Sequence, residues 1–240
     1  MYYGYRYPRF YVDPTYILVL IGVALSLIAS AMVKSTFSKY STLASVSGAT
    51  GAMAAQQILN QSGIYDVRIE RVRGHLTDHY DPRTKVLRLS DSVYGSRSVA
   101  AISVAAHECG HAIQHHQGYA PLSWRSALVP VANFGSTLSW PLIVIGLFMG
   151  GAGNIFTSIG IVLFTAVVLF HLVTLPVEFN ASRRGLAILK NSGMLYEREN
   201  LAAAKVLRAA AMTYVASAAT MILQLLRLLI ITRGRRDNDN

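Results

Sequence analysis

The sequence predicts a mainly α-helical integral membrane protein, with about four transmembrane helices and a small α+β region on the water side. Its 240 residues are 52% hydrophobic and only 14% charged, whereas soluble domains carry about a quarter charged residues. Four apolar runs have the length that crosses a bilayer. A longer polar segment separates the first two runs, and within it a helical pattern carries the motif HExxH. These observations together define the predicted fold class.

The four apolar runs are each long enough to cross a hydrocarbon core of about 30 Å as a helix. They cover residues 16–33, 132–149, 155–177 and 209–231. The glycine-rich segment 150–154 separates the second run from the third and predicts a tight turn between antiparallel helices. The fourth run continues a helix that we expect to begin near Glu197. The chain is therefore expected to form one membrane-embedded domain (1–240), with water-side segments 34–127 and 178–208.

The first apolar run also shares features with a cleavable signal peptide. Arg6 and Arg9 precede it, and Ala29-Ser30-Ala31 resembles a cleavage site. The run is long for the apolar core of a signal peptide, so we expect a retained membrane anchor.

The distribution of Lys and Arg predicts the orientation of the protein in the membrane. Near the ends of the runs, the side with the large polar segment carries Lys34, Lys39, Arg125, Arg183, Arg184, Lys190, Lys205 and Arg208. The opposite side carries Arg6, Arg9, Arg233, Arg235 and Arg236. This excess predicts that the large segment, and any site in it, lies in the cytoplasm. The net charge is +10, and the Lys and Arg residues lie mainly between and beside the apolar runs. This distribution favours anionic lipid headgroups over nucleic acid as the partner.

The water-side segment has patterns for several short elements. Residues 51–60 predict a helix that ends before a Ser-Gly pair. Residues 67–72 and 85–89 alternate in hydrophobicity, which predicts two short strands. Between them, residues 78–83 form a turn-rich link. We therefore expect a small β-hairpin beside the HExxH helix.

The HExxH motif indicates a metal site on a helix predicted over residues 98–116. His107 and His111 are four residues apart, so they lie on one helical face, one turn apart, where both can bind one zinc ion. Glu108 projects beside that ion, where it can take a proton from water and pass it to a leaving amine. The flanking residues are strongly apolar, so buried His and Glu side chains need a partner or an ion there.

His115 continues the spacing of the two histidines but does not fit as a third ligand. It lies about 12 Å from His107 along the axis, at 1.5 Å per residue. Gln114 and Gln117 stand where the longer metzincin motif requires Gly and His, which excludes that class. His115 is instead interpreted as a residue of the helix end.

Glu178 is the best candidate for the third ligand. Between Asp91 and Glu197 the chain has only two carboxylates, Glu108 and Glu178. Glu178 follows Pro176 at the end of the third run, where we expect a helix to restart with Pro in its first turn. Two His, one Glu and an open position would form a catalytic zinc site. The alternative is a Glu that only favours a helix N-terminus through the helix dipole.

Three runs of the sequence resemble a known family. They are residues 78–82 (DHYDP), 106–115 (AHECGHAIQH) and 176–184 (PVEFNASRR). Together they are similar to the YugP-type neutral zinc metallopeptidases of bacterial membranes, and the resemblance covers nearly the whole chain. That family resembles the HtpX and CAAX prenyl protease group, and the resemblance implies that Glu178 is a zinc ligand. Ser182 departs from the pattern, because it occupies the position of an aspartate that orients a ligand histidine; its hydroxyl can still accept a hydrogen bond from His107 or His111.

Other side chains are weaker candidates. His79 and Tyr80 can stabilise the oxyanion of a tetrahedral intermediate, or they can belong to a turn that only satisfies local backbone. His171 lies inside the third run, where an ionisable group indicates function or a single interhelical hydrogen bond. Cys109, the one cysteine, is expected to be a small packed residue.

The sequence therefore predicts a multi-pass protein of the bacterial cell membrane that uses Zn²⁺ to hydrolyse peptide bonds of membrane or membrane-proximal proteins. Its partners would be the lipid bilayer and a protein or peptide substrate, with any regulatory or oligomeric partner left open. The alternative function is a non-catalytic scaffold or adaptor with a structural zinc. Four protein ligands and no solvent access would favour that scaffold.

Overall fold

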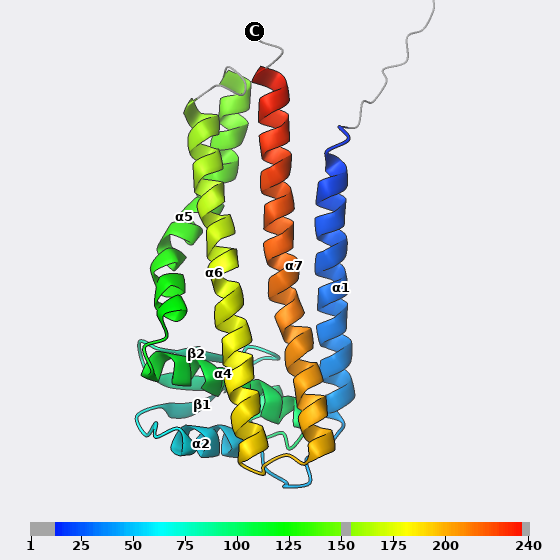
Figure 1. The fold of residues 1–240 in the computed structure, drawn as a ribbon, viewed down its shortest axis with the longest axis vertical. Coiled ribbons are helices and arrows are strands. Elements are labelled where there is room, and N and C mark those ends of the chain that lie inside the picture. The colour runs from blue at the N-terminus through cyan, green and yellow to red at the C-terminus, as the bar shows by residue number, and fades with distance from the viewer. Residues whose placement is uncertain (1–12, 150–154, 237–240) are drawn as a thin grey trace, which may run out of the picture.

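The computed structural model describes residues 13–149 and 155–236, and four long helices run along its length (Figure 1). They are α1 (Tyr16–Ser41), α5 (Ala120–Met149), α6 (Ile155–Asn191) and α7 (Glu197–Arg236). Each contains one predicted apolar run, and all four are long and apolar enough to cross a membrane. The predicted fold class is confirmed. The predicted turn at 150–154 lies outside the described residues, as do Arg6 and Arg9.

The long helices expose large apolar side chains on their outer surfaces. These include Leu20, Leu27, Ile28, Phe134, Val162, Leu169 and Leu226. In water such continuous apolar surface would be costly, whereas lipid solvates it. The exposed faces of the four helices are therefore the surfaces that contact the bilayer.

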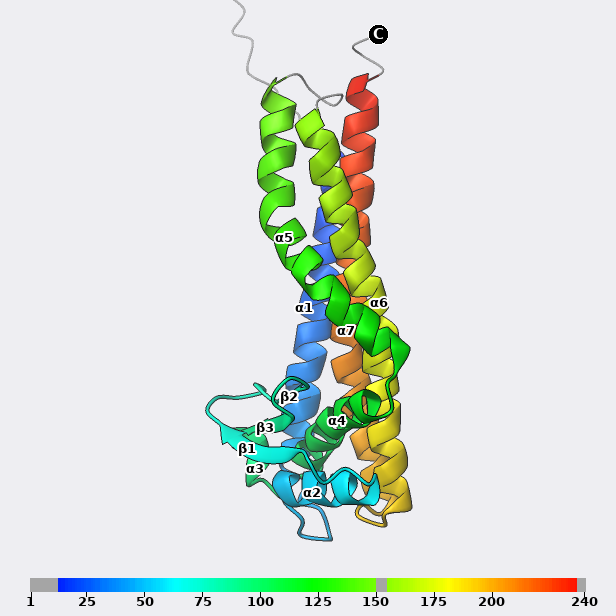
Figure 2. The same ribbon diagram turned by 90° about the vertical axis from the view of Figure 1, so that its left-hand side faces the viewer.

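A smaller region lies at one end of the long helices (Figures 1 and 2). It consists of α2 (Gly51–Gln61), β1 (Arg68–Val72), β2 (His79–Asp81), β3 (Val86–Ser90), α3 (Asp91–Tyr94) and α4 (Val99–His116). Its hydrophobic core joins α2, α3, α4 and the sheet to the adjoining ends of α6 and α7. The helix α4 is the centre of this core, because 14 of its residues are buried. The hydroxyl of Ser98 caps α4 by accepting a hydrogen bond from the Ala101 N–H at 3.2 Å.

The sheet differs from the expected hairpin. Its order is β1-β3-β2, and β1 pairs with β3 in parallel, whereas β2 pairs antiparallel with β3. The segment 78–83 is therefore not only a turn-rich link, because it contains β2. A strand of three residues is too short to show a period of two, and neighbouring parallel strands need a long connection that local pattern does not reveal. β2 is an edge strand, and its free edge faces α4.

The helix α6 also differs from expectation. It continues without interruption from Ile155 to Asn191 and includes Pro176, so the predicted restart of a helix at this proline is wrong. Proline is tolerated in helices of membrane proteins, because neighbouring groups satisfy the backbone. In contrast, α5 changes direction part-way along its length (Figure 2), and it contains Pro130 and Pro141. The first part of α5 lies near α4 as a result.

Two glycines allow α4 and α6 to cross in close contact. A Cβ atom added to Gly110 would overlap the carbonyl oxygen of Ala181, and one added to Gly185 would lie 2.5 Å from that of Ala106. Both contacts are with backbone, which cannot move aside as a flexible side chain can. The crossing therefore requires glycine on both helices.

We predict that Gly110→Ala separates the two helices, lowers stability by about 1–3 kcal/mol as in overpacked cores, and reduces the amount of bound zinc. Thermal unfolding and metal analysis of the purified protein measure both effects. The matched control is Gly95→Ala, where an added Cβ meets no atom within 4 Å. Equal behaviour of the two variants would contradict the packing argument.

Candidate metal centre

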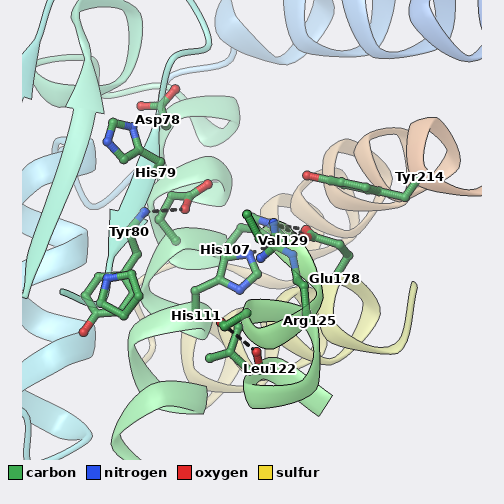
Figure 3. Close-up of a pocket in the computed structure, with 13 residues that line it drawn as sticks. Asp78, His79, Tyr80, His107, His111, Leu122, Arg125, Val129, Glu178 and Tyr214 are labelled. Carbon is green, nitrogen blue, oxygen red and sulfur yellow. Dashed lines mark hydrogen bonds and ion pairs between the residues drawn. The ribbon is translucent and has the colours of Figure 1, made fainter. Parts of the chain in front are cut away.

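His107 and His111 of α4 meet Glu178 of α6 at the crossing of the two helices (Figure 3). The Oε2 atom of Glu178 lies 3.2 Å from Nε2 of His107 and 3.5 Å from Nε2 of His111. All candidate ligand atoms lie within 4.8 Å of one another. Within residues 13–149 and 155–236, this is the one group of three or more His, Cys, Asp and Glu side chains that is close enough to hold a metal ion.

The chemistry of this group fits zinc. Glu178 is only 2% exposed, and its Oε2 atom is buried without a hydrogen-bond partner. A buried carboxylate oxygen without a donor is costly, so it needs a cation. Two imidazole nitrogens and one carboxylate oxygen are the donor set of catalytic zinc sites that keep an open position.

The hydrogen bonds of His111 direct one of its ring nitrogens toward the metal position. Its Nδ1 atom lies 3.0 Å from Oε1 of Gln114, and the amide nitrogen of Gln114 donates to the Val177 carbonyl at 2.8 Å and to Asn180 Oδ1 at 3.0 Å. Because the Gln114 oxygen can only accept, Nδ1 of His111 carries the hydrogen. The lone pair of the neutral ring is then on Nε2, the atom that faces Glu178.

His107 has a weaker supporting contact. Its Nδ1 atom lies 3.0 Å from the hydroxyl of Ser182 on α6. Groups of this kind orient metal-binding histidines and raise their basicity. The neutral hydroxyl of Ser182 raises the basicity of a histidine less than a charged aspartate at the same position would.

Glu108 lies next to the ligands but binds the edge of the sheet. Its Oε2 atom accepts a hydrogen bond from the backbone N–H of Tyr80 in β2, at 3.1 Å. The phenol of Tyr80 points away from the metal group (Figure 3) and lies 2.9 Å from Nδ1 of His115. His79 has an exposed side chain whose Nδ1 atom lies 2.9 Å from the carbonyl of Thr77. Both rings therefore contact groups other than the metal ligands.

His171 and Cys109 lie apart from the ligands. The His171 ring packs edge-on against Phe170 at 5.7 Å, and it does not line the cavity beside the metal group. Cys109 is fully buried, and burial raises the pKa of its thiol well above its ordinary value. The thiol therefore stays protonated and acts as a packed apolar side chain.

A cavity of about 290 Å³ opens beside the ligands, and we call it the metal cavity. Its walls come from α4, α5, α6, α7 and the segment that contains β2. The lining residues are Asp78, His79, Tyr80, Pro82, His107, Glu108, His111, Leu122, Arg125, Ser126, Val129, Glu178 and Tyr214. Sequence reasoning missed Arg125 and Tyr214. The signal that could have indicated Tyr214 is its polar hydroxyl within an apolar run. Arg125 is interpreted from the sequence only as one of the basic residues that set the membrane orientation.

Two carboxylates, Glu178 and the neighbouring Glu108, act on His111 in this site. Burial lowers the pKa of His111, but the adjacent Glu178 carboxylate and the charge of Glu108 raise that pKa overall. Arg125 partly balances this charge, because its guanidinium nitrogen lies 3.8 Å from Oε1 of Glu178. A bound cation would neutralise the remaining charge.

Comparison with known proteins places the chain in a family of zinc peptidases. The profile of the family described as "Putative neutral zinc metallopeptidase" matches residues 15–233. The chain belongs to this family. A protein of Bacillus subtilis (strain 168) named "Putative membrane protease YugP" is 47% identical over 222 residues, which cover 92% of this chain and 98% of that relative. No solved structure matches the chain.

Family membership and structure together identify a multi-pass membrane protein with zinc as its cofactor. The predicted family resemblance is confirmed. His107, His111 and Glu178 form a group that could hold such an ion.

We predict that Glu178→Ala lowers zinc affinity more than about tenfold, since a loss of supporting partners alone costs 10–100-fold. The variant leaves two histidines without the acidic ligand. Metal analysis and competition with a chelator measure the change, and Glu197→Ala at the exposed start of α7 is the control. If Glu178→Ala binds zinc fully and with unchanged affinity, Glu178 is not a zinc ligand.

Proposed function

We propose that this protein is a zinc-dependent endopeptidase that hydrolyses peptide bonds of membrane or membrane-proximal proteins. The observation that carries the proposal is the grouping of His107, His111 and Glu178 with Glu108 beside an open cavity. Helix α4, which carries His107, Glu108 and His111, lies in the smaller region at one end of the long helices (Figures 1 and 2). A substrate anchored in the same bilayer would reach a site at this level.

The ligand atoms in this proposal are Nε2 of His107, Nε2 of His111 and Oε2 of Glu178. When bound there, zinc would polarise the scissile carbonyl and lower the pKa of water. The supporting contacts of Ser182 and Gln114 hold both rings in the orientation that presents Nε2. These residues thus fix the geometry before a substrate arrives.

Glu108 acts as the general base and then as the general acid. Its Oε2 atom is held by the Tyr80 N–H, and among the described residues no hydrogen bond reaches its Oε1 atom. The carboxylate takes a proton from water as the water oxygen bonds to the carbonyl carbon. It then gives that proton to the leaving nitrogen as the C–N bond breaks. The products are one carboxylate and one amine.

Tyr214 is the donor that we favour for the oxyanion of this reaction. It enters the metal cavity from α7, and its hydroxyl points into the space beside Glu178 (Figure 3). A positioned donor of this kind stabilises the charge that develops on the carbonyl oxygen. We favour Tyr214 over the predicted His79 and Tyr80, because the rings of those two residues bind other groups.

A structural zinc in a non-catalytic scaffold is the alternative. Such sites are closed by four protein ligands. Here three candidate ligands group together and the metal cavity lies beside them, an arrangement that supports catalysis over the scaffold.

We also propose that the site faces the cytoplasm. The described end of the molecule that holds the site carries Lys34, Lys39, Arg183, Arg184 and Lys190 near the helix ends. Basic residues of this kind accumulate on the cytoplasmic side of membrane proteins.

The Glu108→Gln variant tests the proposed function directly. We expect it to retain zinc, because the glutamine keeps the size of the side chain, and to lose at least about 100-fold in kcat/KM, because the amide cannot accept the proton. Cleavage of quenched fluorescent peptides by the full chain in detergent, together with metal analysis, measures both. Unchanged turnover would remove Glu108 from the mechanism.

The role of Tyr214 leads to a separate prediction. Tyr214→Phe should lower kcat by about 100–1000-fold, as removal of one oxyanion donor does, with zinc content and KM retained. Tyr196→Phe, at a tyrosine that is 61% exposed, is the matched control. If Tyr214→Phe has the same kcat as Tyr196→Phe, Tyr214 has no catalytic role. The same conclusion follows if Tyr214→Phe loses zinc and its kcat per bound zinc equals that of the wild type.

A further inference from the structure

A second cavity, of about 260 Å³, lies against His107 and Glu108. It is lined by residues of α1, α4, α7 and the loop between β1 and β2. Its apolar walls are Val33, Leu76, Val104, Val206, Leu207 and Ala210. We call it the apolar chamber. Tyr214 lines both this chamber and the metal cavity, so the two spaces adjoin at its side chain.

Asp78, His107 and Glu108 line the chamber, but each already has a partner or a proposed role. Asp78 lines it, but the carboxylate of Asp78 accepts hydrogen bonds from the backbone N–H of Ser90 at 2.7 Å and from its hydroxyl at 2.9 Å. The remaining polar groups include His107 and Glu108, which the metal and the reaction use. A charged group would lose its hydration here without compensation, whereas an apolar side chain gains by leaving water.

The edge of β2 provides a path for an extended peptide past Glu108. The Tyr80 N–H points outward from the sheet, and because the N–H and C=O of one strand residue share a side, the Tyr80 carbonyl also faces this path. Asp78 lines the chamber at one end of this edge, and Pro82 and Arg83 line a further cavity of about 470 Å³ at the other. Peptides commonly bind strand edges as an added strand; here Glu108 occupies the Tyr80 N–H, and the Tyr80 carbonyl is the group that can accept a hydrogen bond from such a peptide.

The chamber can receive large side chains because its far end is not closed. Val33, Leu76 and Thr213 also line a wider space of about 560 Å³ along α1. Val33 ends the first apolar run of the sequence, so we place the chamber near the expected membrane boundary. Aliphatic and aromatic residues are abundant at that level in membrane proteins.

We propose that the apolar chamber is a specificity subsite that binds a large aliphatic or aromatic side chain of the residue adjacent to the cleaved bond. This inference rests on the proposed function. The peptide lies along the edge of β2, the scissile carbonyl lies between Glu108 and Tyr214, and one neighbouring side chain enters the chamber.

The first test measures kcat/KM of the zinc-loaded full chain on peptides with Ala, Leu, Phe, Asp or Lys at each position beside the cleaved bond. We expect one position where Leu or Phe exceeds Asp and Lys by about tenfold or more, the range of discrimination in apolar pockets. Ala210→Phe should fill the chamber and abolish this preference while cleavage of the Ala peptide remains. Ala204→Phe, on the same helix but outside the chamber, is the matched control.

The outcomes separate this inference from the proposed function. If wild-type protein with full zinc cleaves none of the peptides, the proposed function fails. If it cleaves them without an apolar preference, or if Ala210→Phe and Ala204→Phe keep the same preference, the chamber is not a subsite.

A binding measurement covers the case in which Ala210→Phe does not fold. Glu108→Gln is irradiated with the best peptide carrying a photoreactive leucine at the preferred position. Cross-links to Val33, Val206 or Ala210 are expected, and cross-links confined to other surfaces would overturn the proposal.

Discussion

At the crossing of α4 and α6, the backbone of one helix lies directly against the backbone of the other. Gly110 meets the carbonyl of Ala181, and Gly185 meets that of Ala106. The candidate metal ligands come from these same two helices, and their side chains are short compared with the usual separation of packed helices, about 8–10 Å. Only a close crossing brings a Glu oxygen on α6 within 3.2–3.5 Å of two imidazole nitrogens on α4.

Hydrogen bonds that cross the same contact turn this proximity into an oriented site. Gln114 is fully buried and joins His111 to the Val177 carbonyl and to Asn180. Asn180 in turn accepts a hydrogen bond from Arg184 at 2.6 Å. Because Gln114 and Asn180 are both paired in this network, it holds the His111 ring in place without leaving either buried amide unpaired.

The regular features of the sequence predicted much of the fold. Long apolar runs predicted the four helices, and the spacing of the HExxH motif predicted that His107 and His111 share one face of α4. The strand β2 was missed, because three residues show no periodicity, and Pro176 was mistaken for a helix start, because local preference ignores neighbouring helices. Tyr214 was missed for a related reason, since a tyrosine in an apolar helix is more often a residue of the membrane interface.

The sequence by itself determined the chemistry available to this protein. It contains apolar runs that require a membrane, two histidines at helical spacing, and Glu108 directly after the first of these histidines. These properties depend on residue type and short spacing, which need no knowledge of distant contacts. The tertiary structure alone decided that Glu178 reaches those histidines, that β2 presents a free edge to Glu108, and that Arg125 and Tyr214 enter the cavity. Such contacts join residues far apart in the chain, and only the packing of helices and sheet brings them together.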